Sequence, residues 1–168
     1  MIQVYTGEGK GKTTAALGLI VRALGHDRKA ALIQFMKKNF EYGEIRFLSA
    51  QKQVDIFQFG TDKLIDPNNP AKIDKEEAEK AYRKCKEIIS SHEYDLIVID
   101  EINVAVRWNL LALEKQLELM EMKTEAEIVM TGRYAEEKVI EKADLATEMK
   151  EIKHYFRNGM QARKGVEY

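Results

Sequence analysis

A glycine-rich segment near the start of the chain, reading Thr-Gly-Glu-Gly-Lys-Gly-Lys-Thr-Thr from Thr6 to Thr14, constrains the fold more than any other part of the sequence. It follows an apolar stretch, residues 2–5, that predicts a short strand. It leads into an Ala- and Leu-rich stretch, residues 13–24, that predicts a helix ending at Gly25. A strand, a tight glycine turn and a helix in this order bring successive backbone N–H groups around one point, where they can surround an anion. The segment therefore predicts a phosphate-binding loop.

The residue types within this loop suit the phosphates of a nucleoside triphosphate. Alternating glycines let the backbone adopt left-handed conformations and approach phosphate oxygens closely. Lys12 is expected to bridge the terminal phosphates, and the hydroxyl of Thr13 to ligate Mg²⁺. The general phosphate-loop pattern has glycine where this chain has Thr6, and the alternative interpretation is a glycine-rich turn with solvated lysines. The predicted phosphate-binding residues are Gly7, Glu8, Gly9, Lys10, Gly11, Lys12, Thr13 and Thr14.

Apolar runs alternate with helix-like stretches along the rest of the chain, which is typical of strands joined through helices. A polar loop over residues 36–43 and an irregular segment around Pro-Asn-Asn-Pro, residues 67–70, interrupt this pattern, and the tail after Met149 has no strong period. We expect a single α/β domain over residues 1–168, with a P-loop NTPase-like (RecA-like), mostly parallel sheet flanked by helices. The further strands are predicted at residues 30–35, 54–59, 96–99 and 126–131. The further helices are predicted after Asp74 to about Ser90 and at residues 110–122 and 136–142.

The net charge, the hydropathy and the cysteine content of the chain limit the kinds of partner and site that we expect. The formal net charge of −1 leaves no basic excess for nucleic acid or an anionic membrane, and no stretch approaches a membrane span. The single Cys85 cannot form an intrachain disulfide, and its helical spacing with Tyr82 and Ile89 predicts a buried apolar position. We expect a cytoplasmic protein that binds its nucleotide locally.

Acidic and basic side chains follow two of the predicted strands. Asp100 and Glu101 end the apolar run 96–99, and Arg133 follows the run 126–131. Ligands of open α/β sheets bind at the carboxyl ends of the strands, so a carboxylate here can complete a Mg²⁺ site with Thr13. The alternatives are two solvated acids and an ordinary surface arginine.

The sequence carries no recognisable nucleophilic elbow and no zinc-ligand spacing, because its three histidines are scattered. Acyl transfer and zinc hydrolysis are therefore disfavoured. The predicted site offers charge stabilisation for a leaving polyphosphate, so the attacking group is expected to come from a second substrate.

Several stretches, in their order and spacing, resemble the ATP:corrinoid adenosyltransferase family of the phosphate-loop type and cover nearly the whole chain. The Gly-x-Gly-Lys-Gly-Lys-Thr-Thr form of the loop in this chain identifies that family far more specifically than a general phosphate loop would. The stretches are Thr6-Gly-Glu-Gly-Lys-Gly-Lys-Thr-Thr-Ala-Ala, Arg22-Ala-Leu-Gly-His26, Gln34-Phe35, Leu96-Ile-Val-Ile-Asp-Glu-Ile102, Thr131-Gly-Arg133 and Lys153-His154 followed by Gly165-Val-Glu-Tyr168.

The resemblance implies transfer of the 5′-deoxyadenosyl group of ATP to Co(I) of a corrinoid, cobalamin or cobyrinic acid a,c-diamide, with triphosphate as the leaving group. It implies that Lys12 and Glu101 are catalytic and that Thr13 and Glu101 hold Mg²⁺ (or Mn²⁺) with support from Asp100. Arg133, in the matching stretch Thr131-Gly-Arg133, is expected to join the nucleotide site. It also implies a homodimer and transient contact with a flavoprotein reductant. The rival functions are a small P-loop ATPase or regulatory module, and a nucleoside kinase.

One loop departs from the family pattern. Some members have a Phe and a Trp after the glycine that matches Gly60, where they help to remove the lower cobalt ligand, whereas this chain has no aromatic residue there and its Trp108 lies elsewhere. Our hypothesis is that Leu64 or Ile65 substitutes for them by apolar packing.

Overall fold

Six parallel strands form the centre of the computed structural model, which describes residues 1–38 and 42–168. The strand order is β3-β2-β4-β5-β1-β6, so the strand before the phosphate loop is separated from β4 by β5. All the described strands run in the same direction, which confirms the α/β class. The strands are β1 Ile2–Thr6, β2 Ala30–Phe35, β3 Val54–Phe59, β4 Leu96–Asp100, β5 Glu127–Thr131 and β6 Leu145–Glu148.

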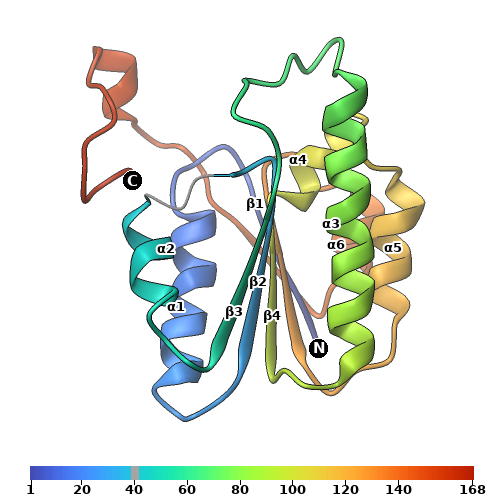
Figure 1. Cartoon of the computed structure of the whole chain (residues 1–168). Helices are drawn as coiled ribbons and strands as arrows, with labels where there is room; N and C mark the ends of the chain where they lie inside the picture. The colour runs from blue at the N-terminus through green and yellow to red at the C-terminus, as the bar shows by residue number, and fades with distance from the viewer. Residues whose placement is uncertain (39–41) are drawn as a thin grey trace.

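Helices cover both faces of this sheet (Figure 1). One core lies beneath α1 and α2, and the other lies between the sheet and α3, α4, α5 and α6. Every residue of β2 and of β4 is buried, as expected for central strands packed on both faces. The helices are α1 Lys12–Leu24, α2 Gly43–Leu48, α3 Lys72–Ser91, α4 Ile102–Arg107, α5 Leu113–Glu121 and α6 Glu137–Lys142, followed by the 3₁₀ turn η1 Tyr155–Asn158.

The longest helix confirms one prediction and corrects another. The apolar face of α3 predicted from the sequence is buried, and burial raises the pKa of the Cys85 thiol. The helix begins at Lys72 and not after Asp74. Asp74 lies in the first turn, where its carboxylate accepts a hydrogen bond from the backbone N–H of Ala71 at 3.0 Å. Asp74 thus satisfies a free N–H of the helix start from inside the helix.

Four described elements were not predicted, among them η1 in the tail after Met149. The short helix α2 lies within a connection expected to be a loop, because Ile45 and Leu48 bury their side chains against the sheet. Residues 39–41 of the predicted polar loop lie outside the described residues. Helix α4 follows β4 directly, and β6 adds an exposed strand beside β1. No helix in the described ranges is long and apolar enough to cross a membrane.

Strand direction determines where the functional residues meet. The N-terminus lies at one end of the sheet, whereas the phosphate loop and the C-terminal tail lie at the other (Figure 1). The loop is held there by backbone contacts with the chain leaving β6: Gly9 N–H donates to the carbonyl of Met149 at 2.6 Å, and Met149 N–H donates to the carbonyl of Thr6 at 2.8 Å. These contacts leave little room for side chains at the first glycines of the loop.

Replacing Gly7 by Ala is expected to destabilise the fold. The new Cβ would lie 2.6 Å from the carbonyl oxygen of Met149, and Gly7 has a φ of +93°. Strain and overpacking of this kind lower the free energy of unfolding by roughly 1–3 kcal/mol, which urea denaturation measures.

Gly18→Ala is the matched control, because a Cβ at Gly18 in α1 meets no heavy atom within 4 Å. Removing a glycine from a helix interior should raise the free energy of unfolding by up to about 1 kcal/mol. If both variants changed stability in the same direction, the close contact at Gly7 would not be the cause.

Candidate nucleotide-binding site

A cavity of about 930 Å³ lies at the carboxyl edge of the sheet, within the size range of small-molecule sites. The phosphate loop forms one wall, and residues that follow β2, β4 and β5 form others. Apart from Gly7, all the residues predicted to bind nucleotide or metal line it. They are Glu8, Gly9, Lys10, Gly11, Lys12, Thr13, Thr14, Glu101 and Arg133.

Lys12 lies beneath the loop. Its ammonium donates to the carbonyls of Gly7 at 2.7 Å and Gly9 at 2.6 Å, so it holds the two sides of the turn together. The residue is 8% exposed, and burial lowers the pKa of its ammonium, with a contribution from Arg133. Helix α1 begins at Lys12 itself, directly after Gly11, whose backbone adopts a left-handed conformation. Lysine, free N–H groups and the positive end of the helix dipole together favour an anion.

Asp100 is the centre of a hydrogen-bond network. Its carboxylate is fully buried, and one oxygen accepts from the hydroxyls of Thr13 at 2.9 Å and Thr131 at 2.6 Å. The other oxygen accepts from the amide of Gln34 at 2.9 Å and the ammonium of Lys37 at 2.7 Å. All four donors satisfy the lone pairs of one buried charge.

The attraction between Lys37 and Asp100 outweighs the cost of removing their charges from water. Burial disfavours the charged form of both groups, but their mutual attraction holds the pKa of Asp100 below its ordinary value and that of Lys37 above it. Both groups are therefore ionised at neutral pH.

Glu101 has a different environment. Its backbone adopts a left-handed conformation, with φ 64°, at the turn between β4 and α4, and its N–H donates to Thr131 Oγ1 at 3.0 Å. Burial, and then the neighbouring Asp100, raise the pKa of the Glu101 carboxyl. Within residues 1–38 and 42–168 no hydrogen bond to this carboxylate is found, so its oxygens are available to a ligand.

The donor set fits a hard cation. The Thr13 hydroxyl and the Glu101 carboxylate are oxygen ligands of the kind Mg²⁺ prefers, and Mg²⁺ in nucleotide sites is commonly held by one or two carboxylates together with substrate phosphates. The described part of the chain contains no group of three or more His, Cys, Asp and Glu that could hold a metal ion. A metal ion here would therefore need further ligands from the phosphates of the substrate.

Arg133 follows β5, as expected, and lies on the cavity wall. Its guanidinium is 3.3 Å from the Glu8 carboxylate, and both side chains are about half exposed. This exposed ion pair contributes little to stability, so Arg133 can be redirected at low cost.

Two groups of residues around the site were not identified from the sequence. Lys37 was not singled out, although it follows the carboxyl end of β2, where the rule that identified Asp100 and Arg133 also applies. The C-terminal tail matched the family pattern, but its structure was left open and it was given no role in the site, yet His154 and residues 165–168 line the cavity. Lys10, predicted to bind phosphate, contacts this tail through Tyr155 and Glu167.

Comparisons with known proteins identify the family of the chain. The family model of the ATP:corrinoid adenosyltransferase BtuR/CobO/CobP matches residues 1–168. A corrinoid adenosyltransferase of Sinorhizobium sp is 39% identical over 172 residues, covering 100% of this chain and 80% of that protein. Corrinoid adenosyltransferases of Pseudomonas aeruginosa and Escherichia coli (strain K12) are each 32% identical over 169 residues, covering 100% of this chain and 83% and 85% of those proteins. Among solved structures, the cytoplasmic domain of EssC matches with a TM-score of 0.56 and 13% identity, over 97% of this chain and 33% of that chain, which supports the fold alone.

Replacing Lys37 by Met removes the cation beside the fully buried Asp100 carboxylate. We expect the free energy of unfolding to fall by about 3 kcal/mol near neutral pH, because an unpaired buried charge remains. The pair stabilises the fold above the pKa of the unfolded carboxyl, about 3.9, and its contribution is lost as the pH falls further. The difference between variant and wild type should therefore shrink below about pH 4, as measured by urea denaturation across pH.

Lys38→Met is the control, because Lys38 is the exposed neighbour of Lys37. It should change stability by less than about 0.5 kcal/mol. Equal stability of the two variants at neutral pH would contradict the role assigned to the buried pair.

Proposed function

The chain belongs to the ATP:corrinoid adenosyltransferase family, and from this premise we propose that its phosphate loop holds the triphosphate of ATP while the adenosyl group passes to a reduced corrinoid. The family identifies the chain as an enzyme that adenosylates corrinoids with ATP in cobalamin metabolism. The residue roles, the metal, the assembly and the compartment described below are our proposals.

The observation that carries the proposal is the position of Thr13. Its hydroxyl lies 2.9 Å from the buried Asp100, so the first turn of α1 is fixed against the acidic end of β4. Lys12 precedes it, and Glu101, the residue after Asp100, lines the same cavity. A loop that binds phosphates thereby faces a carboxylate that can share a cation with them.

In the proposed reaction the corrinoid cobalt, as Co(I), is the nucleophile. Its electron pair forms the cobalt–C5′ bond, the bond between C5′ and the triphosphate oxygen breaks, and that electron pair leaves with triphosphate. No proton has to be removed from the nucleophile, so the site needs no general base. Lys12, the loop N–H groups and the N-terminus of α1 are assigned to the charge on the leaving group, and Arg133, beside Glu8 of the loop, is proposed to assist them.

Mg²⁺, or Mn²⁺, is proposed to be held by Thr13 and Glu101. When bound, the ion supplies positive charge that stabilises the leaving triphosphate. Asp100 is assigned the task of orienting the Thr13 hydroxyl, because all of its lone pairs are engaged by protein donors.

The corrinoid is proposed to meet the apolar part of the same cavity. Leu64, Ile65 and Trp108 line it, and Leu64 is fully exposed whereas Ile65 packs partly against the core. This arrangement supports, without testing, the hypothesis that Leu64 or Ile65 takes the place of the Phe and Trp found in some relatives. Complete and incomplete corrinoids both remain within the proposal.

The remaining proposals follow from the family. We propose one adenosyltransferase domain over residues 1–168, a homodimer, a cytoplasmic location, and a flavoprotein that transiently supplies electrons to the corrinoid. Neither nucleic acid nor a membrane is proposed as a partner, because the net charge of −1 offers no general attraction to either.

The first experiment is an absorption assay with chemically reduced cobalamin and MgATP. We expect a light-sensitive adenosylcorrinoid to form together with one equivalent of triphosphate. Lys12→Ala should lower the rate by at least about a hundredfold, since preorganised charge on a leaving group contributes that much. Orthophosphate or ADP without a cobalt–carbon product would instead favour an ATPase or a nucleoside kinase.

A second experiment tests the metal ligand. Glu101→Gln should raise the Mg²⁺ concentration needed for half-maximal activity by roughly tenfold or more. Because burial and Asp100 disfavour the ionised carboxylate, the same variant should raise the melting temperature of the ligand-free protein by roughly 2–4 °C. Scanning calorimetry and a Mg²⁺ titration measure these effects.

Glu93→Gln provides the control, since Glu93 is an exposed acid at the opposite end of the sheet, ahead of β4. It should alter neither quantity. An unchanged Mg²⁺ requirement in Glu101→Gln would remove Glu101 from the metal site.

A further inference from the structure

The C-terminal tail, residues 149–168, crosses the phosphate loop and forms part of the cavity wall. It passes the loop at Met149, whose carbonyl accepts from Gly9 N–H at 2.6 Å. After the turn η1 it returns, and Gly165, Val166 and Tyr168 line the cavity beside the loop. The ribbon of the tail reaches away from the sheet above α1 and α2 (Figure 1).

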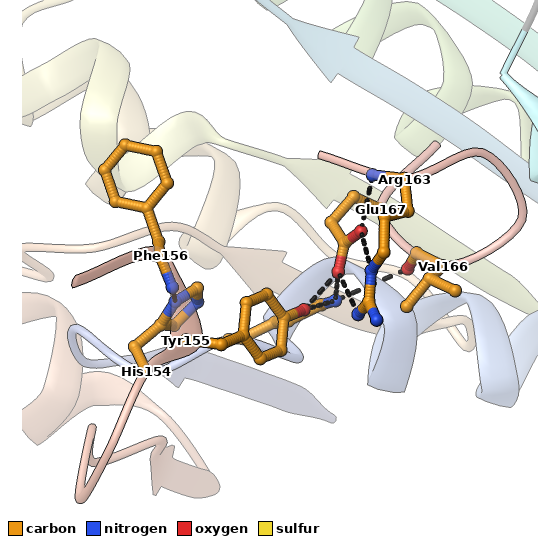
Figure 2. Close-up of polar contacts among 7 residues, drawn as sticks. His154, Tyr155, Phe156, Arg163, Val166 and Glu167 are labelled. Carbon is orange, nitrogen blue, oxygen red and sulfur yellow. Dashed lines mark hydrogen bonds and ion pairs between the residues drawn. The ribbon is translucent and has the colours of Figure 1, made fainter. Parts of the chain in front are cut away.

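Glu167 organises the end of this tail. Its carboxylate accepts from the backbone N–H of Arg163 at 2.7 Å, from Arg163 Nε at 3.3 Å and from Arg163 Nη2 at 3.2 Å. It also accepts a short hydrogen bond from the Tyr155 hydroxyl. Figure 2 shows Glu167 between Arg163 and Tyr155, with both side chains directed toward its carboxylate. The side chain is only 16% exposed.

The same carboxylate binds the phosphate loop through Lys10. The Lys10 ammonium lies 2.8 Å from Glu167 Oε1 and 2.7 Å from the Tyr155 hydroxyl, with the carbonyl of Val166 at 3.4 Å. The hydrogen bonds raise the pKa of Lys10, and those from Arg163, Lys10 and Tyr155 lower the pKa of Glu167. Both groups are therefore charged over the physiological pH range.

Few other contacts tie the end of the tail to the body of the protein. The ring of Tyr168 lies 6.4 Å from that of Tyr42, and Arg157 pairs with Glu151 within the tail itself. Among the described residues, Lys10 is the only side chain outside the tail that hydrogen-bonds to residues 155–168. Apart from the ring contact of Tyr168 with Tyr42, the hydrogen bonds that hold this wall to the rest of the described chain thus come from the single ammonium of Lys10.

We propose that Glu167 is a positioning residue of the nucleotide site: acting through Lys10, it holds the C-terminal tail against the phosphate loop and so completes the wall that retains MgATP. The inference rests on the proposed function, because it assigns the loop to the triphosphate. Glu167 also keeps the Lys10 side chain in place at the cavity wall.

The test compares Glu167→Gln, Glu167→Asp and Glu151→Gln in the full chain. Glu151 is the matched control, because it is another tail carboxylate of similar exposure, 19%, whose partner is Arg157 and not the loop. Calorimetric titration with MgATP gives affinity, hydrogen exchange of residues 163–168 reports the tail, and steady-state assays give kcat and KM.

Glu167→Gln should weaken MgATP binding and raise the KM for ATP by roughly fivefold to tenfold, since a charge-assisted contact is lost. It should also accelerate exchange in residues 163–168 while kcat changes less than about twofold. Glu167→Asp should recover part of the affinity, and Glu151→Gln should retain all of it.

Faster exchange with unchanged MgATP affinity would overturn the proposal, because the tail would then be free of the nucleotide site. Equal losses in Glu167→Gln and Glu151→Gln would overturn it too, by showing a general effect of tail charge. If the wild type failed to bind MgATP, the proposed function itself would be contradicted. The other two outcomes would leave the proposed function intact.

Discussion

The buried carboxylate of Asp100 is the interaction on which the site depends. A charge fully removed from water is tolerated only when its lone pairs are satisfied, and here the donors come from separate parts of the chain. Thr13 belongs to the first turn of α1, Gln34 to β2 and Thr131 to β5, and Lys37 follows β2. Satisfying one carboxylate therefore fixes the phosphate loop relative to three neighbouring strands. Such a constraint preorganises a site for charge before any substrate enters.

The site also keeps charge that the fold does not neutralise. Glu101 lies next to Asp100 in a partly buried position that raises the pKa of its carboxyl, and burial lowers the pKa of Lys12. In the ligand-free chain, burial thus disfavours the charged form of each group. A cation together with a polyphosphate would favour both charged forms. Functional sites commonly keep such groups at a cost to the stability of the ligand-free protein.

The parts of the fold that sequence predicted well are those with strong local patterns. Strands β2 and β3 have the predicted bounds, and the apolar face of α3 is buried as its spacing indicated. The failures have a shared cause. Helix α2 is short, with two buried apolar residues, so its period is too brief to recognise, and β6 is an exposed edge strand whose pattern carries no apolar run. The partners of Asp100 could not be inferred because strand order decides which carboxyl ends are neighbours.

The sequence by itself determined the phosphate loop, the acidic end of β4 and the family, because each is written in consecutive residues whose chemistry is local. Only the tertiary structure decided that Lys37 neutralises Asp100 and that Glu167 reaches Lys10, which lies 157 positions away along the chain. The physical reason is that these are contacts between side chains of distant segments. A parallel sheet gathers the carboxyl ends of its strands at one edge, and their order in the sheet is set by the packing of the whole domain.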